Sequence, residues 1–173
     1  MDDAIDVLSW GPARTWSQAP ARVLPSDLPG AARAVGEHLA GSPGAWLLFW
    51  DPLLGEPPLE EARRLIASRV GDAWHAGLAL GHGGLPDEHD YIHPTTPFVL
   101  DPAADVDGTC WRLSLGAALV RTEALVAVGG LDPAFHGATG AGLELGHRLI
   151  EHGALVRNAP QLVQATGTRA VAL

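Results

Sequence analysis

Apolar residues along the chain occur in short blocks, which are separated by glycine, proline and charged residues. Residues 45–50 (AWLLFW) are apolar at every position and lie between Gly44 and Pro52. A short continuous apolar run with such borders is typical of a strand that is buried on both faces of a sheet. Further strands are expected at residues 4–10, 22–24, 73–80, 113–120, 154–157 and 162–163.

Helical spacing of apolar residues falls between these strands. Asp27 can cap a helix over residues 30–40, which Gly41 would end. Residues 58–70 begin with proline and have glutamates early and arginines late, an order that complements the helix dipole. Two more helices are expected at residues 122–128, with Thr122 as the cap, and at residues 143–152, ended by Gly153. Residues 81–109 are rich in glycine, proline, aspartate and histidine and predict a long irregular segment. Helices that alternate with strands in this way predict an α/β fold with a mostly parallel sheet.

Composition narrows the class of protein. The length of 173 residues suits one domain with a sizeable core. The net charge is −9, and all 11 basic residues are arginines without a basic block, so nucleic acid is not an expected partner. No apolar run is long enough to span a membrane, and the acidic start lacks the features of a signal peptide, so we expect a cytoplasmic protein. The one cysteine, Cys110, is interpreted as a small core residue because no base is identifiable near it in the sequence.

Four segments share a pattern with a known family. They read PGAARAVG at residues 29–36, WLLFWDPL at 46–53, VGGLDPAF at 128–135 and ELGHRL at 144–149. Together they resemble family 2 glycosyltransferases of the GT-A type over roughly residues 22–160. The resemblance implies one GT-A-like domain, with a nucleotide-binding half over residues 1–58, a helix, strand and loop over 59–110, and an acceptor-side half over 111–173. It also implies that at least one strand–helix unit of the nucleotide-binding half is missing before Arg22.

The positions that carry chemistry in that family depart from its pattern here. The family's D-x-D motif, which holds a divalent metal, falls on Asp51 and Leu53, and leucine is not a metal ligand. The family's Glu-Asp pair, whose aspartate is the general base, falls on Ala141 and Gly142. A nucleoside-contacting aspartate has no clear counterpart, because the residues in its place read Ser-Trp-Gly at 9–11. We therefore expect no cofactor, and Mn or Mg only if the chain is active.

The remaining acidic and basic candidates each have two interpretations. Asp51 is either a turn residue that bonds to nearby backbone N–H groups or a retained substrate or metal contact. Glu144 is either a helix-start residue favoured by the dipole or a relocated catalytic base. Arg148 is either a substrate contact or the partner of Glu144 in an ion pair four residues apart.

Two further groups could bind ligands. His89 and His93, with His82 and Asp90 near them, have side chains that Zn or Mn accepts, but the spacing also fits an exposed polar loop. Among the tryptophans, those at positions 10 and 16 lie near glycine and proline and are candidates for a saccharide-binding or protein-contact surface.

Three functions follow from these observations. The first is a catalytically degenerate glycosyltransferase-like domain that acts as a binding or partner-contact domain, with weak nucleotide-sugar or saccharide affinity. The second is an active glycosyltransferase that uses a rearranged site, and the third is a structural subunit paired with an active transferase. We also expect a homodimer or pairing with another chain, on the reasoning that the apolar strand at 45–50 has lost part of its cover and that Trp10 and Trp16 lie nearby.

Overall fold

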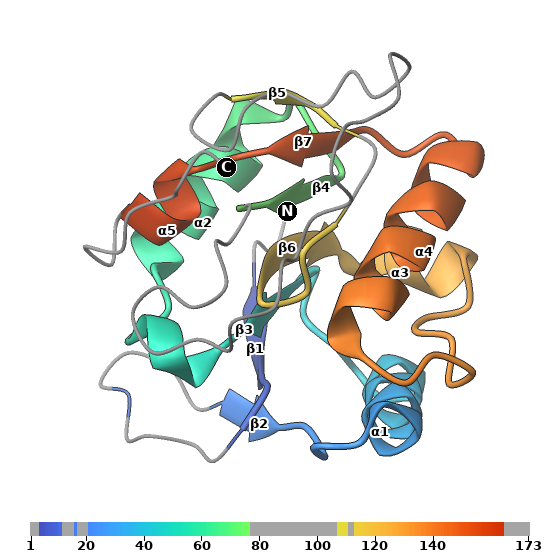
Figure 1. The fold of residues 1–173 in the computed structure, drawn as a ribbon. Helices are drawn as coiled ribbons and strands as arrows, with labels where there is room; N and C mark the ends of the chain where they lie inside the picture. Colours follow the sequence, from blue (N-terminus) through green and yellow to red (C-terminus); the bar gives the residue numbers. More distant parts are fainter. Residues whose placement is uncertain (1–3, 12–15, 17–20, 77–106, 111–112, 165–173) are drawn as a thin grey trace, which may run out of the picture.

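A sheet of mixed direction organises the chain. The computed structural model describes residues 4–11, 16, 21–76, 107–110 and 113–164, and these residues form a seven-stranded sheet in the order β2-β1-β3-β6-β4-β7-β5 (Figure 1). The strands are β1 (Ile5–Ser9), β2 (Ala21–Val23), β3 (Trp46–Trp50), β4 (Ala73–His75), β5 (Gly108–Thr109), β6 (Ala117–Arg121) and β7 (Val156–Asn158). The helices are α1 (Leu28–Ala40), α2 (Leu59–Ser68), α3 (Thr122–Ala127), α4 (Ala138–Glu151) and α5 (Gln161–Gln164), with a 3₁₀ turn, η1, at Pro52–Leu54.

Strand directions confirm the predicted, mostly parallel α/β sheet. Strands β1, β2 and β3 are mutually parallel, and β4 is parallel to β7. Strand β6 lies antiparallel between β3 and β4, so β4 and β7 run in the same direction as β3. Strand β5 is antiparallel to β7 at one edge, and β2 forms the other edge. The carboxyl ends of β1, β2, β3, β4 and β7 therefore lie along one edge of the sheet.

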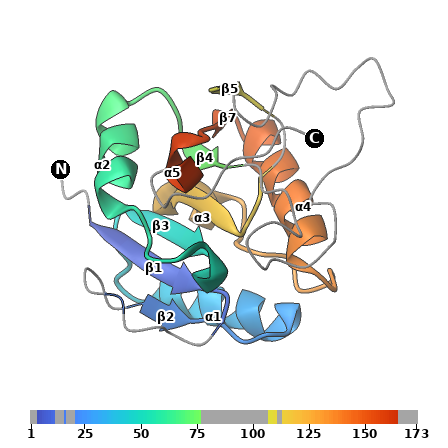
Figure 2. The ribbon, with the colours of Figure 1, turned by 60° about the vertical axis from the view of Figure 1, so that its left-hand side comes forward.

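Helices cover both faces of the sheet. One apolar cluster joins α1, α3 and α4 to the sheet through residues such as Val35, Leu125 and Leu145. The other joins α2 and α5 to the opposite face, through Leu65 and Leu162 among others. Figure 2 shows this separation, with α2 and α5 on one side of the sheet and α1 and α4 on the other.

Strand β3 confirms the expected doubly buried strand. Its five residues are at most 5% exposed. Leu47 and Phe49 belong to the cluster under α1 and α4, and the alternate residues Trp46, Leu48 and Trp50 belong to the cluster under α2. The chain itself therefore covers this strand, and the expectation that a partner must shield it is wrong.

The capping residue predicted for α1 and the early glutamates predicted for α2 are both found in the structure. The Asp27 side chain accepts a hydrogen bond of 2.7 Å from the Gly30 N–H, and α1 ends just before Gly41. Helix α2 follows Pro58, and Arg64 bonds to glutamates one turn earlier.

Four boundary predictions were wrong. The strand expected over residues 113–120 begins only at Ala117, and the helix expected over 143–152 begins five residues earlier, at Ala138. The segment 162–163 lies in α5 rather than in a strand. Thr122 is the first residue of α3 instead of its cap, and its hydroxyl donates a 2.6 Å hydrogen bond to the Gly44 carbonyl. This bond and the contact of Gly142 with the Leu113 carbonyl join segments far apart in the sequence, so local spacing does not show them.

Over the residues that the structure describes, no helix has both the length and the apolar character needed to cross a bilayer.

Candidate functional site

Polar residues stand at the carboxyl ends of four strands. Ser9 ends β1, Asp51 directly follows β3, His75 ends β4 and Asn158 ends β7. The register pairs Ser9 with Trp50 and His75 with Asn158, so these residues lie at similar heights along one edge. In open α/β sheets this edge is where ligands bind. We therefore take it as the candidate functional site.

Sequence reasoning found only one of these four residues, Asp51, as a candidate. Ser9, His75 and Asn158 are at most 3% exposed. From the sequence, Ser9 is noted only as the residue at the place of a missing aspartate, and neither His75 nor Asn158 is named as a candidate. The signal that could have found them is a single polar residue at the end of an apolar strand. That signal depends on knowing the strand directions, which place the ends together.

The crevice between β1 and β3 is the place where the order of the strands changes direction, since β2 lies on one side of β1 and β3 on the other. Trp10 follows β1, and its ring stacks on Phe49 of β3 with 6.3 Å between centroids. Its indole Nε1 donates a 2.6 Å hydrogen bond to the Leu115 carbonyl, just before β6. The Trp10 side chain thus reaches from the end of β1 across β3 to the segment before β6.

Trp16, the second aromatic candidate, lies elsewhere. It is half-buried and packs against the apolar cluster on the α2 face. Its indole nitrogen is buried and has no hydrogen-bond partner. Trp10 and Trp16 therefore contact different layers, and they do not form one binding surface within the described residues.

Asp51 acts as a turn residue. Its side-chain Oδ1 accepts a 2.8 Å hydrogen bond from the Leu53 N–H, and its backbone carbonyl accepts one from Leu54. Its own N–H donates to the Gly116 carbonyl at 2.7 Å, which ties it to the start of β6. Burial raises the pKa of the Asp51 carboxyl above its usual value of 3.8, and the hydrogen bond from Leu53 opposes that rise.

The donor set at the D-x-D position does not suit a divalent metal. Asp51 already uses one carboxylate oxygen for the turn, and Leu53 presents an apolar side chain that is 47% exposed. Hard cations such as Mg prefer several oxygen ligands. Among the residues that the structure describes, no group of three or more histidine, cysteine, aspartate or glutamate side chains could hold a metal ion. His89 and His93, the other metal candidates, lie outside the described residues, as do His82 and Asp90.

Gly142 lies where the resemblance places a general base. It is buried in α4, and a Cβ atom built on it would overlap the carbonyl oxygen of Leu113 and lie 3.3 Å from the Leu115 side chain. Helix α4 thus packs directly on the backbone that precedes β6, and no side chain fits at position 142. Gly142 has no side chain that could act as a base, and for the same reason it allows α4 to pack on the Leu113 carbonyl.

Glu144 and Arg148 form the ion pair that their spacing predicts. Both carboxylate oxygens of Glu144 accept hydrogen bonds from the Arg148 guanidinium. Arg148 also donates to the carbonyls of Val128 and Gly130, the second at 2.9 Å. Gly129 and Gly130 have φ values of 82° and 79°, which favour glycine. The pair therefore holds the turn between α3 and α4, and it engages both oxygens that a catalytic role for Glu144 would require.

A histidine lies beside Cys110, contrary to the expectation of no nearby base. The Cys110 thiol is 6% exposed, and its Sγ lies 3.2 Å from the Nε2 of His75. The Nδ1 of the same ring accepts a 3.2 Å hydrogen bond from the Ser114 N–H. Because Nδ1 accepts, Nε2 carries the hydrogen and donates it to the sulfur. His75 in this tautomer cannot take a proton from the thiol, so the pair joins β4 to the segment before β6.

Comparisons of the chain with protein-family models, with curated proteins and with solved structures found no match. The functional interpretation therefore depends on the geometry of this edge.

A first prediction concerns the contact between Gly142 and the Leu113 carbonyl. An aspartate at position 142 should disrupt the packing of α4 on this segment. We expect Gly142→Asp to lower the free energy of unfolding by at least about 1–3 kcal/mol, the usual cost of forcing atoms into a filled core. Gly137→Asp is the matched control: a Cβ at Gly137 meets nothing within 4 Å, and the residue is the N-cap of α4. Aspartate is favoured at an N-cap, so the control should be as stable as the wild type or slightly more stable. Urea unfolding of both variants checks this, and equal losses would contradict the packing argument.

The raised pKa of Asp51 makes a second prediction. A group whose folded pKa lies above its unfolded pKa contributes stability below the unfolded value, and that contribution is lost as pH rises through the folded pKa. Asp51→Asn removes the charge and keeps an oxygen for the Leu53 N–H. Relative to wild type, the variant should therefore gain stability between about pH 3.9, the unfolded value, and neutral pH. Urea unfolding at pH 3, 5 and 7 measures this difference, and a flat or opposite trend would show that burial does not raise the pKa.

Proposed function

We propose that this chain is a GT-A-like domain related to family 2 glycosyltransferases that no longer transfers sugar and acts as a binding or partner-contact domain. The fold supports the assignment at a coarse level, as a mostly parallel sheet with helices on both faces. The four segments that carry the resemblance also lie on suitable elements. PGAARAVG lies within α1, WLLFWDPL forms β3 and its turn, VGGLDPAF follows α3, and ELGHRL lies within α4.

Gly142 carries the proposal of lost catalysis. The family's general base would stand there, and the Leu113 carbonyl occupies the space that its side chain would need. A general base contributes about 10²–10⁴-fold to a rate. On this proposal, the close packing of α4 on Leu113 is the physical reason that position 142 carries no base.

Trp10 supports the same proposal independently. Its indole stacks on Phe49 and bonds to the Leu115 carbonyl beside the β1–β3 junction, where a nucleotide would be expected in an open α/β sheet. Any remaining nucleotide-sugar or saccharide affinity would have to use the outer side of this ring and the Asp51 carboxyl, and it would be weak.

One observation favours the alternative of an active enzyme with a rearranged site. Asp51 is a half-buried carboxyl with a raised pKa at the ligand-binding edge of the sheet, and such groups occur at active sites. Its bond to Leu53 and the lack of a second acid nearby in the motif weigh against it.

The proposal predicts no sugar transfer. Purified protein incubated with common nucleotide sugars, Mn or Mg and saccharide acceptors should release nucleoside diphosphate at the rate of a blank without protein. Release that depends on the acceptor and is lost in Glu144→Gln would establish the active alternative. Glu123→Gln is the matched control, since Glu123 is exposed and lies at the start of α3, away from this edge. Thermal melts of both variants separate lost activity from lost folding.

Partner contact is best supported at the β2 edge. Within the described residues β2 pairs only with β1, so its other side offers backbone groups for pairing. Val23 of this strand is 42% exposed. Antiparallel pairing of β2 with its copy would give a closed two-fold dimer. This edge replaces the uncovered strand β3 as the reason to expect a homodimer.

Light scattering at micromolar concentration should then report about twice the chain mass of 18.1 kDa. Val23→Lys should restore the monomer, because lysine on an edge strand opposes pairing. Val126→Lys is the control, since Val126 is a valine of similar exposure, 53%, on α3. A wild-type protein that is monomeric throughout this range, or equal effects of the two lysines, would refute pairing of copies through β2.

A further inference from the structure

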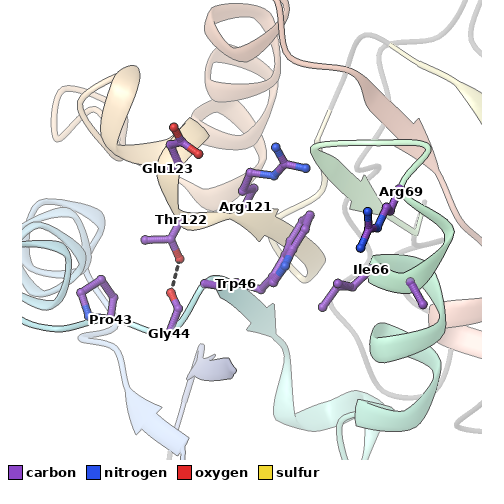
Figure 3. A pocket seen from close by; sticks show the side chains of 10 residues that line it. Pro43, Gly44, Trp46, Ile66, Arg69, Arg121, Thr122 and Glu123 are labelled. Carbon is purple, nitrogen blue, oxygen red and sulfur yellow. Dashed lines mark hydrogen bonds between the residues drawn. The ribbon is translucent and has the colours of Figure 1, made fainter. Parts of the chain in front are cut away.

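A groove lies at the edge of the sheet opposite the candidate site. It has a volume of about 930 Å³ and is lined by residues from the start of β3, the end of α2 and the junction of β6 with α3 (Figure 3). Trp46 is the first residue of β3 and Asp51 follows its last, so about 13–16 Å of strand separates the two places. The groove shares no residue with the candidate site. Its volume is that of a small-molecule site.

Arg121 is held in place at one side of the groove. Its Nη1 lies 3.1 Å from the Asp72 Oδ1, and its guanidinium carbon lies 5.4 Å from the centroid of the Trp46 ring. Trp46 is itself fixed by packing on Trp74, with 5.3 Å between ring centroids. The Arg121 side chain is still 42% exposed, so N–H groups that do not bond to Asp72 can reach a ligand. A cation that is ordered in advance loses little freedom when it binds.

Arg69 brings a second cation to the same groove from a strained backbone. It caps the end of α2 with φ 56° and ψ 24°, and it is the one residue other than glycine with positive φ in the described part of the chain. Glycine or asparagine is the usual residue in this conformation. Arg69 makes no ion pair within the described residues, and Figure 3 shows Arg69 and Arg121 on either side of the Trp46 ring. A strained position that is filled by an arginine facing a groove points to a use for its charge.

We infer that this groove binds a small organic anion, with a phosphate or carboxylate group held between Arg69 and Arg121. Guanidinium groups donate paired hydrogen bonds to both oxyanions. The apolar part of the ligand would contact Ile66, which lies below Arg69 in Figure 3, and the Trp46 ring between the two arginines. Glu123 also lines the groove, but it lies on the far side of Arg121 from Arg69. The net charge of the chain is −9, so an anion that binds here must be attracted by the local charge of these two arginines.

Phenyl phosphate, benzoate and phenol are suitable probes, because they share a ring and differ in charge and oxyanion type. Titration of the ¹⁵N-labelled protein at constant ionic strength should shift the Trp46 indole and the arginine Nε–H signals. Phenyl phosphate or benzoate should bind with a Kd on the order of 1 mM, a realistic value for ligands of this size. Phenol should bind at least tenfold more weakly. The stronger of the two anions then identifies the phosphate or the carboxylate as the natural group.

Arg69→Gln should weaken anion binding at least tenfold, whereas Arg63→Gln, at an exposed arginine of α2 that does not line the groove, should leave it unchanged. Arg69→Gly gives the decisive comparison. It removes the cation and relieves the strained φ, so the melting temperature should stay the same or rise while anion binding falls. Equal binding of phenol and both anions, or equal effects of the two glutamine variants, would overturn the inference. Unchanged anion binding in Arg69→Gly would do so as well.

Discussion

Complete burial of β3 between two helix layers is the constraint on which the other features depend. Leu47 and Phe49 face one layer and Leu48 and Trp50 face the other, and each such side chain contributes about 1.5–3 kcal/mol when it leaves water. A strand fixed in this way cannot shift its register without exposing one of the two faces. Its ends are therefore rigid. Trp46 anchors the arginine groove at one edge, and Asp51 begins the turn at the other.

Close approach of α4 to the backbone before β6 decides what the carboxyl edge can do. Gly142 lets the helix rest on the Leu113 carbonyl, and Leu115 accepts the hydrogen bond from Trp10 in the same segment. The Leu113 carbonyl leaves no space for a side chain at position 142, and the Trp10 indole stacks on Phe49 at the same edge. Close packing of this kind stabilises the fold through many short contacts, and it fixes the segment before β6 against α4.

Much of the fold could be predicted from the sequence, and less of the site. Features that depend only on nearby residues were predicted from the sequence. They are the apolar run at 45–50, the cap at Asp27 and the ion pair between Glu144 and Arg148. The early start of α4 could not be predicted, because Gly142 packs on the Leu113 carbonyl and local spacing does not show that contact. The contact between His75 and Cys110 could not be predicted either, because the two residues are 35 positions apart and meet only through the arrangement of the strands. The left-handed backbone conformation of Arg69 could not be predicted from the sequence, because glycine or asparagine is the usual residue in that conformation.

The positions at which the chain agrees with the glycosyltransferase pattern differ in their physical role from those at which it departs. Gly129 and Gly130 adopt positive φ, and Arg148 binds the carbonyls of Val128 and Gly130 while it pairs with Glu144. These residues hold backbone in place. The departures at Leu53 and Gly142 affect side chains that would touch a metal or a proton. A domain that loses its chemistry but is still required to fold would show this division, because the backbone contacts stay necessary after the reaction has been lost. Under the proposal made above, the groove at the opposite edge of the sheet and the exposed β2 edge are therefore better candidates for a binding role than the carboxyl edge.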